Sequence, residues 1–196
     1  MTRRQLTAPA AGRQVMALCS GLPAAGWSVQ ITGMNSIIFE PLHDGVEPPA
    51  RATEGSAGAD LRAYLIGRSV QCSDGARQWE QSTDGSSTLV LDPGAMALVP
   101  LGFRARLPHG IEAQIRPRSG AAFKKGLHIA NSPGTVDSDY PDEWMVPVRN
   151  GGTGPLIIAH GERVAQMVLA RYEVLVIESG VVSSSTSRQG GFGSTG

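Results

Sequence analysis

The sequence is poor in cysteine and in long apolar runs, and both shortages exclude whole classes of protein. Only Cys19 and Cys72 are present among 196 residues. Two thiols are too few for a metal cluster and their spacing suggests no redox pair, so we expect a reduced, cytoplasmic protein. No apolar run approaches the roughly 18 residues that a membrane-spanning helix needs. The four histidines also lie too far apart for a local metal motif.

Neither sign of charge is in excess. The chain has 17 cationic and 17 acidic residues, so its formal net charge is zero. Because this balance gives no strong overall field, we expect neither nucleic acid nor a membrane as a partner. Lysine is scarce, since 15 of the 17 cationic residues are arginine. A guanidinium suits phosphate and carboxylate, but the codon bias of a GC-rich genome explains the excess equally well. The overall excess is therefore no evidence of function, and only individual arginines are considered below.

The start of the chain differs from the rest because it contains no acid before Glu40. Residues 1–33 are expected to form an N-terminal extension, either a transit peptide or a simple arm, with a short helix around Gln14–Leu18. Residues 34–178 are predicted to form one β domain. Their short runs of Val, Ile, Leu and Phe are separated by Gly, Pro, Asn and Asp, and some alternate with period two, as in residues 103–107. The pattern predicts an all-β sandwich, barrel or jelly roll.

Two segments depart from this β pattern. Residues 68–88 are polar and contain two Asp-Gly pairs, which predicts an inserted hairpin or loop. Residues 179–196 are rich in Ser and Gly, which is typical of a flexible C-terminal arm. That arm nevertheless contains Arg188 and Phe192, which a simple linker does not require.

Four segments of the β domain carry residues suited to phosphate chemistry. "RPRSGAAF" (116–123) combines arginine, a hydroxyl and backbone N–H groups in a turn. In "GTVDSDY" (134–140), Asp137 and Asp139 would face one side of an extended strand, where one could activate water. "GERVAQM" (161–167) places a Gln in an apolar run, and "AGADLRA" (57–63) surrounds an Asp with small residues. Each segment alone also fits an ordinary turn or a structural hydrogen bond.

Taken together and in order, these segments and the terminal "GGFGSTG" (190–196) resemble the five motifs of the homotrimeric dUTPases. The resemblance implies a jelly-roll or distorted β-barrel subunit and a homotrimer with three sites at subunit interfaces. Numbered in chain order, the motifs are 57–61, 118–120, 134–140, 161–166 and 190–196. Each site would take motifs one, two and four from one chain, motif three from a second and the tail from a third. The implied reaction is Mg²⁺-assisted hydrolysis of dUTP to dUMP and pyrophosphate, which lowers dUTP and supplies dUMP for dTMP synthesis.

The resemblance assigns the chemistry and the base recognition to one segment. Asp137 resembles the aspartate that deprotonates the attacking water. Tyr140 resembles the ring that packs under the deoxyribose and excludes a 2′-hydroxyl. Asn131, together with Gly134 and Val136 of the same hairpin, resembles the pocket that reads uracil and excludes a 5-methyl group.

The remaining roles concern the phosphates and the metal. Arg118, Ser119 and Gly120 resemble the cradle of the phosphates, and Gln166 resembles the residue that holds water and phosphate. Asp60 resembles the acid that meets Mg²⁺ through water.

The tail supplies the last set of expected contacts. Phe192 resembles the ring that stacks on uracil, and Arg188, Ser194 and Thr195 resemble a clamp on the γ-phosphate, with Gly193 among the substrate-binding residues. The sequence departs from the family in the tail, where Arg188 lies three rather than four residues before Gly191.

A second departure follows the tyrosine, where the family usually has x-Gly-Glu or x-Gly-Gln and this chain has Pro141-Asp142-Glu143. Two alternatives remain open at this point. The related dCTP deaminases share the jelly roll and the triphosphate cradle. A nucleotide-sensing or partner-binding module could also reuse the fold, with residues 68–88 or the N-terminal arm as its contact surface.

Overall fold

The computed structural model describes residues 36–183, which form antiparallel strands and one short helix. The elements are β1 (Ile38–Pro41), β2 (Ala50–Arg51), β3 (Ala59–Arg62), β4 (Ser69–Ser73), β5 (Gln78–Ser82), β6 (Thr88–Leu91), β7 (Met96–Pro100), β8 (Phe103–Arg106), β9 (Ile111–Arg116), α1 (Ser119–Lys125), β10 (Leu127–Ile129), β11 (Gly134–Val136), β12 (Met145–Asn150), β13 (Leu156–Ala159) and β14 (Arg163–Arg171). Within this part of the chain no helix is long and apolar enough to cross a membrane. The extension and the helix expected around Gln14–Leu18 lie outside the described residues.

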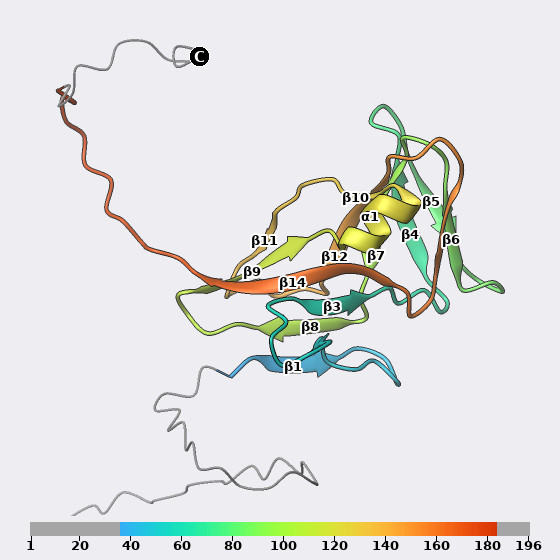
Figure 1. The fold of residues 1–196 in the computed structure, drawn as a ribbon, viewed down its shortest axis with the longest axis horizontal. Coiled ribbons are helices and arrows are strands. Elements are labelled where there is room, and N and C mark those ends of the chain that lie inside the picture. Colours follow the sequence, from blue (N-terminus) through green and yellow to red (C-terminus); the bar gives the residue numbers. More distant parts are fainter. Residues whose placement is uncertain (1–35, 184–196) are drawn as a thin grey trace, which may run out of the picture. The chain divides into compact units, whose positions relative to one another are not determined.

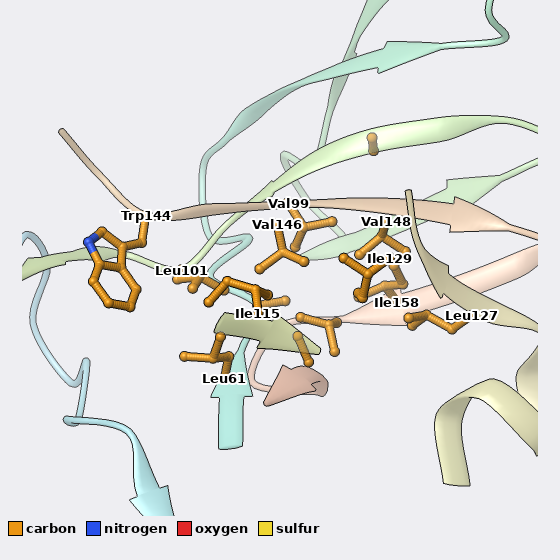
Figure 2. Close-up of a cluster of buried hydrophobic side chains, with 14 of the residues drawn as sticks. Leu61, Val99, Leu101, Ile115, Leu127, Ile129, Trp144, Val146, Val148 and Ile158 are labelled. Atoms are coloured by element: carbon orange, nitrogen blue, oxygen red, sulfur yellow. The ribbon is translucent and has the colours of Figure 1, made fainter. Parts of the chain in front are cut away.

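Two five-stranded antiparallel sheets dominate the fold. Their strand orders are β10-β12-β7-β4-β5 and β11-β9-β14-β3-β2, and the pairs β1-β8 and β13-β6 complete the structure (Figure 1). The buried side chains of both sheets join in one cluster, which Figure 2 shows around Leu61, Ile115, Val99 and Val146. The predicted all-β jelly-roll class is confirmed, because alternating residues of β12 in one sheet and of β9 in the other face one core.

The helix α1 was not predicted. Its seven residues, "SGAAFKK", are too few to show a helical period in the sequence, and only Ala121 among them is buried. The helix ends at Gly126, which has a φ of 63° and closes the last turn. As a result, the turn expected after β9 leads directly into a helix.

The order of one sheet brings together segments that lie far apart in the sequence. β14 pairs with β3 on one side and with β9 on the other. Gln166 of β14 lies opposite both Asp60 of β3 and Arg116 of β9. Three of the sequence segments expected at the site therefore meet across neighbouring strands (Figure 1).

Residues 68–88 form a hairpin that belongs to the other sheet. β4 pairs with β5, and residues 74–77 form the turn that connects the two strands. β4 also pairs with β7 at Cys72 and Ser73. Val70 and Cys72 are buried in the core, and burial raises the pKa of the Cys72 thiol. The hairpin is therefore an integrated part of the sheet and not a loop that hangs from it.

Candidate active site

One open hollow gathers the residues expected to hold phosphates. It has a volume of about 450 Å³, and its walls come from the segment before β3, from the end of β9 and the start of α1, and from β14. The predicted residues in its lining are Asp60, Arg118, Ser119, Gly120 and Gln166. The structure thus brings the expected cradle together within a single chain.

Asp60 organises the charged side of this hollow. Its Oδ1 accepts a hydrogen bond from Arg118 Nε at 2.7 Å, and its Oδ2 accepts one from Arg163 Nη1 at 3.2 Å. The carboxylate is mostly buried, whereas Arg163 is more exposed. Because charge-assisted bonds of this kind fix geometry, Asp60 orients the guanidinium of Arg118 in the lining of the hollow and also that of Arg163, which lies outside the lining.

The side chain of Gln166 lies between the segment that follows β9 and the glycine that precedes β3. Its Nε2 donates to the carbonyl of Pro117 at 3.0 Å. A Cβ at Gly58 would lie 2.2 Å from Gln166 Oε1, so only glycine leaves room for this side chain. Gly58 was not among the predicted site residues, although the small residues around Asp60 were the signal that could have identified it.

Ser119 and Gly120 begin α1 and are both exposed. The first N–H groups of a helix have no partner inside it, so these two residues offer donors toward the open hollow. A Cβ at Gly120 would meet no described atom within 4 Å. The space beside Gly120 is therefore open.

The hairpin expected to recognise the base is also formed. β11 pairs with β9, with Gly134 opposite Ile115 and Val136 opposite Ala113. A Cβ at Gly134 would lie 3.1 Å from the amide atoms of Asn131, so this side chain packs closely on the glycine. Asn131 itself is exposed and Val136 is partly buried.

Asp137 and Tyr140 lie away from the cradle of their own chain. Both are exposed, in a turn where the Tyr140 N–H donates to the Asp137 carbonyl at 3.3 Å. Asp137 follows the residue that pairs with Ala113, whereas the cradle begins at Arg116, at the other end of β9. At about 3.3 Å per residue, three to four strand residues separate the two positions by roughly 10–13 Å.

A separate hollow of about 450 Å³ lies beside this turn and includes Asp139 and Tyr140 in its lining. Arg104 and Glu40 form an exposed pair on its wall, with 2.7 Å between Arg104 Nη2 and Glu40 Oε1. The hydrogen bond from Arg104 holds the pKa of Glu40 below its usual range. Tyr140 and the expected phosphate cradle therefore border different hollows in one chain, and Asp137 is in the lining of neither.

The departure at Asp142 leaves the backbone unstrained. Among the described residues the only non-glycine with positive φ is Ser87, so Asp142 needs no glycine-like conformation. Its side chain is exposed, whereas Glu143 turns inward. The expected tail contacts lie outside the described residues and comprise Arg188, Phe192, Gly193, Ser194 and Thr195.

Together, the fold and the hollow define an all-β protein with an open hollow lined by two arginines and by the first residues of α1, a set of donors suited to phosphate. A family model described as dUTPase matches residues 85–196, which is more than half of the chain. The chain belongs to the dUTPase family.

Individual relatives agree with this assignment. A deoxyuridine 5′-triphosphate nucleotidohydrolase of Rhizobium rhizogenes is 48% identical over 153 residues, which cover 78% of this chain and 86% of the relative. One of Rickettsia typhi is 42% identical over 149 residues, which cover 76% of this chain and 87% of the relative. This relationship favours a hydrolase over the deaminase alternative.

Solved structures show the same fold. A mutant dUTPase of the staphylococcal phage 80alpha has a TM-score of 0.65 at 20% identity and covers 83% of this chain and all of its own, 100%. The dUTPase of Streptococcus mutans has a TM-score of 0.53 at 25% identity, with 72% of this chain and 98% of that chain covered. A mutant dUTPase of phage phi11 of S. aureus, whose structure concerns the coordination of a structural Mg(II) ion, has a TM-score of 0.60 at 17% identity and covers 78% of this chain and 100% of its own.

Proposed function

We propose that this chain carries out its reaction at sites shared between copies of itself. As a dUTP diphosphatase it hydrolyses dUTP to dUMP and pyrophosphate. The observation that supports shared sites is the separation of Asp137 from the cradle of Asp60, Arg118 and Gln166. A base can assist only where it reaches the attacking water directly or through one further water. The loop of one subunit therefore meets the cradle of a neighbour.

An exposed apolar segment supports the same assembly. Residues 174–177 follow β14 without forming a strand, and their side chains are 74% to 95% exposed. Four consecutive apolar residues at this exposure are unusual for a monomer. A continuous apolar run is also typical of a strand covered on both faces. We therefore propose a homotrimer in which this segment is covered by a neighbouring subunit.

Within such a shared site the residues divide the work between them. Arg118 and the N–H groups of Ser119 and Gly120 bind the phosphates and stabilise charge as it moves onto the leaving pyrophosphate. Gln166 holds the water and a phosphate oxygen. Asp137 accepts the proton of that water as it attacks the α-phosphorus, a contribution of about 10²–10⁴-fold.

The sugar and base are held by the neighbouring hairpin. Tyr140 packs under the deoxyribose and leaves no room for a 2′-hydroxyl. Asn131 and the backbone near Gly134 and Val136 hydrogen-bond the uracil edge. Phe192 would stack on the base while Arg188, Gly193, Ser194 and Thr195 close over the phosphates.

The donor set fits Mg²⁺ held through water. Asp60 is the only acid that lines the hollow, and among the described residues no three His, Cys, Asp or Glu side chains gather as a metal cage. Each Asp60 oxygen accepts one arginine bond, which leaves lone pairs for the waters of a hydrated ion. When bound with the triphosphate, Mg²⁺ would neutralise phosphate charge.

Complementation between two inactive variants tests the shared site. Asp137→Asn lacks the base and Arg118→Ala lacks part of the cradle, so each homogeneous assembly should be nearly inactive. Co-expression with two affinity tags yields mixed assemblies, and in a mixed trimer about one site in three has an intact cradle and an intact neighbouring loop. We expect pyrophosphate release from dUTP to recover to about that fraction of the wild-type rate.

The control is the same measurement on separately purified variants mixed without exchange of subunits. If the co-expressed assemblies remain as inactive as the parents, the two residues act within one chain and the shared site is refuted. Omission of Mg²⁺ from the wild-type assay tests the metal independently.

A further inference from the structure

The loop that carries Asp137 is tied to the protein body by a single side chain. Glu143, at the end of that loop, accepts a hydrogen bond from the Gly102 N–H at 2.8 Å through Oε1. Its Oε2 accepts one from Arg68 Nη2 at 2.5 Å. Across residues 137–143, Glu143 is the residue whose side chain makes hydrogen bonds within the described part of the chain.

Arg68 reaches this loop from the hairpin of residues 68–88. It directly precedes β4, and its backbone is fixed by the fully buried Thr83 at the end of β5. The Arg68 N–H donates to Thr83 Oγ1 at 3.2 Å, and the Thr83 N–H donates to the Arg68 carbonyl at 2.9 Å. These bonds fix the backbone of Arg68 at the end of the hairpin opposite the turn, and so they fix the point from which its side chain extends.

The guanidinium of Arg68 is held by two acceptors. Besides Glu143, it contacts His43, with 2.9 Å between Arg68 Nη1 and His43 Nε2. Arginine can only donate, so His43 Nε2 is the acceptor in this contact. His43 in turn stacks on Tyr64, with ring centres 4.3 Å apart. Arg68 is thus fixed on both sides and is only partly exposed.

The other partner of Glu143 is equally constrained. Gly102 has a φ of 76°, and a Cβ there would lie 2.9 Å from the Tyr64 ring. Trp144, the next residue after Glu143, is buried and packs against Phe103 at 5.3 Å between ring centres. The end of the loop is therefore anchored to a rigid base.

We propose that Arg68 is a positioning residue for the reaction: by holding Glu143 it sets the place of the loop that presents Asp137 and Tyr140 to the neighbouring cradle. Only the Arg68 end of the hairpin thereby takes part in positioning the loop, whereas its tip does not. This inference rests on the role given to Asp137 above.

The test compares kcat and KM for dUTP in Arg68→Ala, Arg68→Lys and Glu143→Gln. A displacement of the base by about 1 Å costs far more in chemistry than in binding. We expect Arg68→Ala to lower kcat about tenfold or more, with KM changed by less than about threefold. Arg68→Lys keeps the charge but cannot bridge His43 and Glu143 together, so its kcat should be intermediate.

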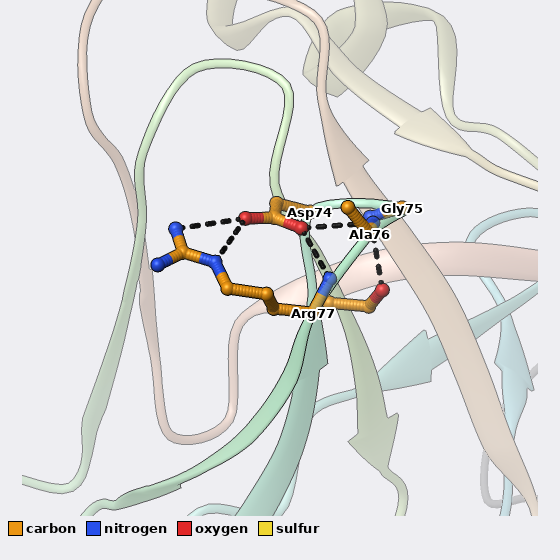
Figure 3. A network of polar contacts seen from close by, with 5 residues as sticks. Asp74, Gly75, Ala76 and Arg77 are labelled. Atoms are coloured by element: carbon orange, nitrogen blue, oxygen red, sulfur yellow. Dashed lines mark hydrogen bonds and ion pairs between the residues drawn. The ribbon is translucent and has the colours of Figure 1, made fainter.

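A double-mutant cycle and a matched control sharpen the result. If Arg68 acts through Glu143, Arg68→Ala should add no further loss of kcat in the Glu143→Gln background. Arg77→Ala removes an ion pair from the tip of the same hairpin, between Arg77 and Asp74 (Figure 3), and should leave kcat unchanged. Each kcat is expressed per assembled, folded enzyme. If Arg68 only stabilised the fold, its replacement would leave this kcat unchanged.

A wild-type kcat in folded Arg68→Ala, or additive losses in the cycle, would overturn the proposal. Should Arg68→Ala not fold, Arg68→Lys decides alone, and a kcat equal to that of the wild type overturns it. Normal turnover by Asp137→Asn would refute the proposed base instead, so the two failures are distinguishable.

Discussion

The phosphate cradle and the loop that carries Asp137 are built in different ways. The cradle lies on three adjacent strands, and Asp60 connects it through bonds to Arg118 and Arg163. The loop extends between β11 and β12 with Asp137 and Tyr140 exposed. The expected cradle residues thus lie together in one chain, whereas Asp137 and Tyr140 lie apart from them.

In the proposed site, this difference separates phosphate binding, at the cradle, from proton abstraction, at the loop. A cradle fixed by a sheet is preorganised for phosphates and needs little adjustment when they arrive. In the shared site proposed above, the base, in contrast, would reach the attacking water only when subunits meet. An isolated or misassembled chain would therefore hold phosphate weakly without hydrolysing it.

The largest expected effect comes from the loop. Asp137→Asn keeps the size of the side chain but removes its capacity to accept a proton, so we expect kcat to fall by about 10²–10⁴-fold. Folding and dUTP binding should be retained, since Asp137 is exposed and makes no side-chain bond within the described residues. Steady-state kinetics and calorimetric titration with a non-hydrolysable dUTP analogue measure the two quantities.

Asp139→Asn is the matched control for that experiment. Asp139 is also exposed, lies two residues further along and lines the other hollow. We expect it to retain turnover within a few-fold of the wild type. Equal losses in both variants would mean that general negative charge, and not a single base, is what the loop contributes.

Gly58→Ala disturbs the cradle and leaves the loop intact. The added Cβ would meet Gln166 Oε1, which is the mobile end of a side chain, so Gln166 should swing away from Pro117. Because the core is not overpacked, we expect stability to change by less than about 1 kcal/mol, while kcat/KM falls roughly tenfold, or about 1.4 kcal/mol in transition-state stabilisation.

Thermal unfolding and kinetics check this prediction. Gly55→Ala is the control, since a Cβ there would meet no described atom within 4 Å and its φ is not positive. A Gly58→Ala enzyme as active as Gly55→Ala would show that Gln166 does not need its place against Pro117.

The sequence predicted the class of fold because strand alternation is a local signal. The pattern at residues 103–107 is seen directly as β8, with Phe103 and Ala105 buried and the arginines outside. The Asp74-Gly75 pair likewise lies in the turn between β4 and β5. Turn residues and the period-two alternation of apolar residues can both be recognised within a few consecutive residues.

What the sequence could not show depends on pairs far apart in the chain. Arg118 and Asp60 are 58 residues apart, and Arg68 and Glu143 are 75 apart, so neither bond has a local signature. The motif resemblance selected the cradle residues but gave no reason for Gly58, which only the position of Gln166 explains.

The smallest expected effect is at the tip of the hairpin, remote from both regions. Asp74 accepts hydrogen bonds from the N–H groups of Ala76 and Arg77 and from the Arg77 guanidinium (Figure 3). The backbone bond from Arg77 contributes most to lowering the Asp74 pKa from 3.8 to about 2. A depressed carboxyl pKa contributes stability above the unfolded value, and this contribution is lost as pH falls from about 4 toward 2.

Urea unfolding of the wild type and Asp74→Ala at pH 7 and pH 3 measures that contribution. At pH 7 the variant should be slightly less stable, with dUTP hydrolysis unchanged, and the difference should shrink at pH 3 as the wild-type carboxylate begins to protonate. A difference that is constant with pH would mean that the turn is held by backbone geometry and not by the Asp74 charge. A loss of hydrolysis at pH 7 would instead show that the hairpin tip is coupled to the loop, so that the remote end of the hairpin and its Arg68 end could no longer be treated as independent.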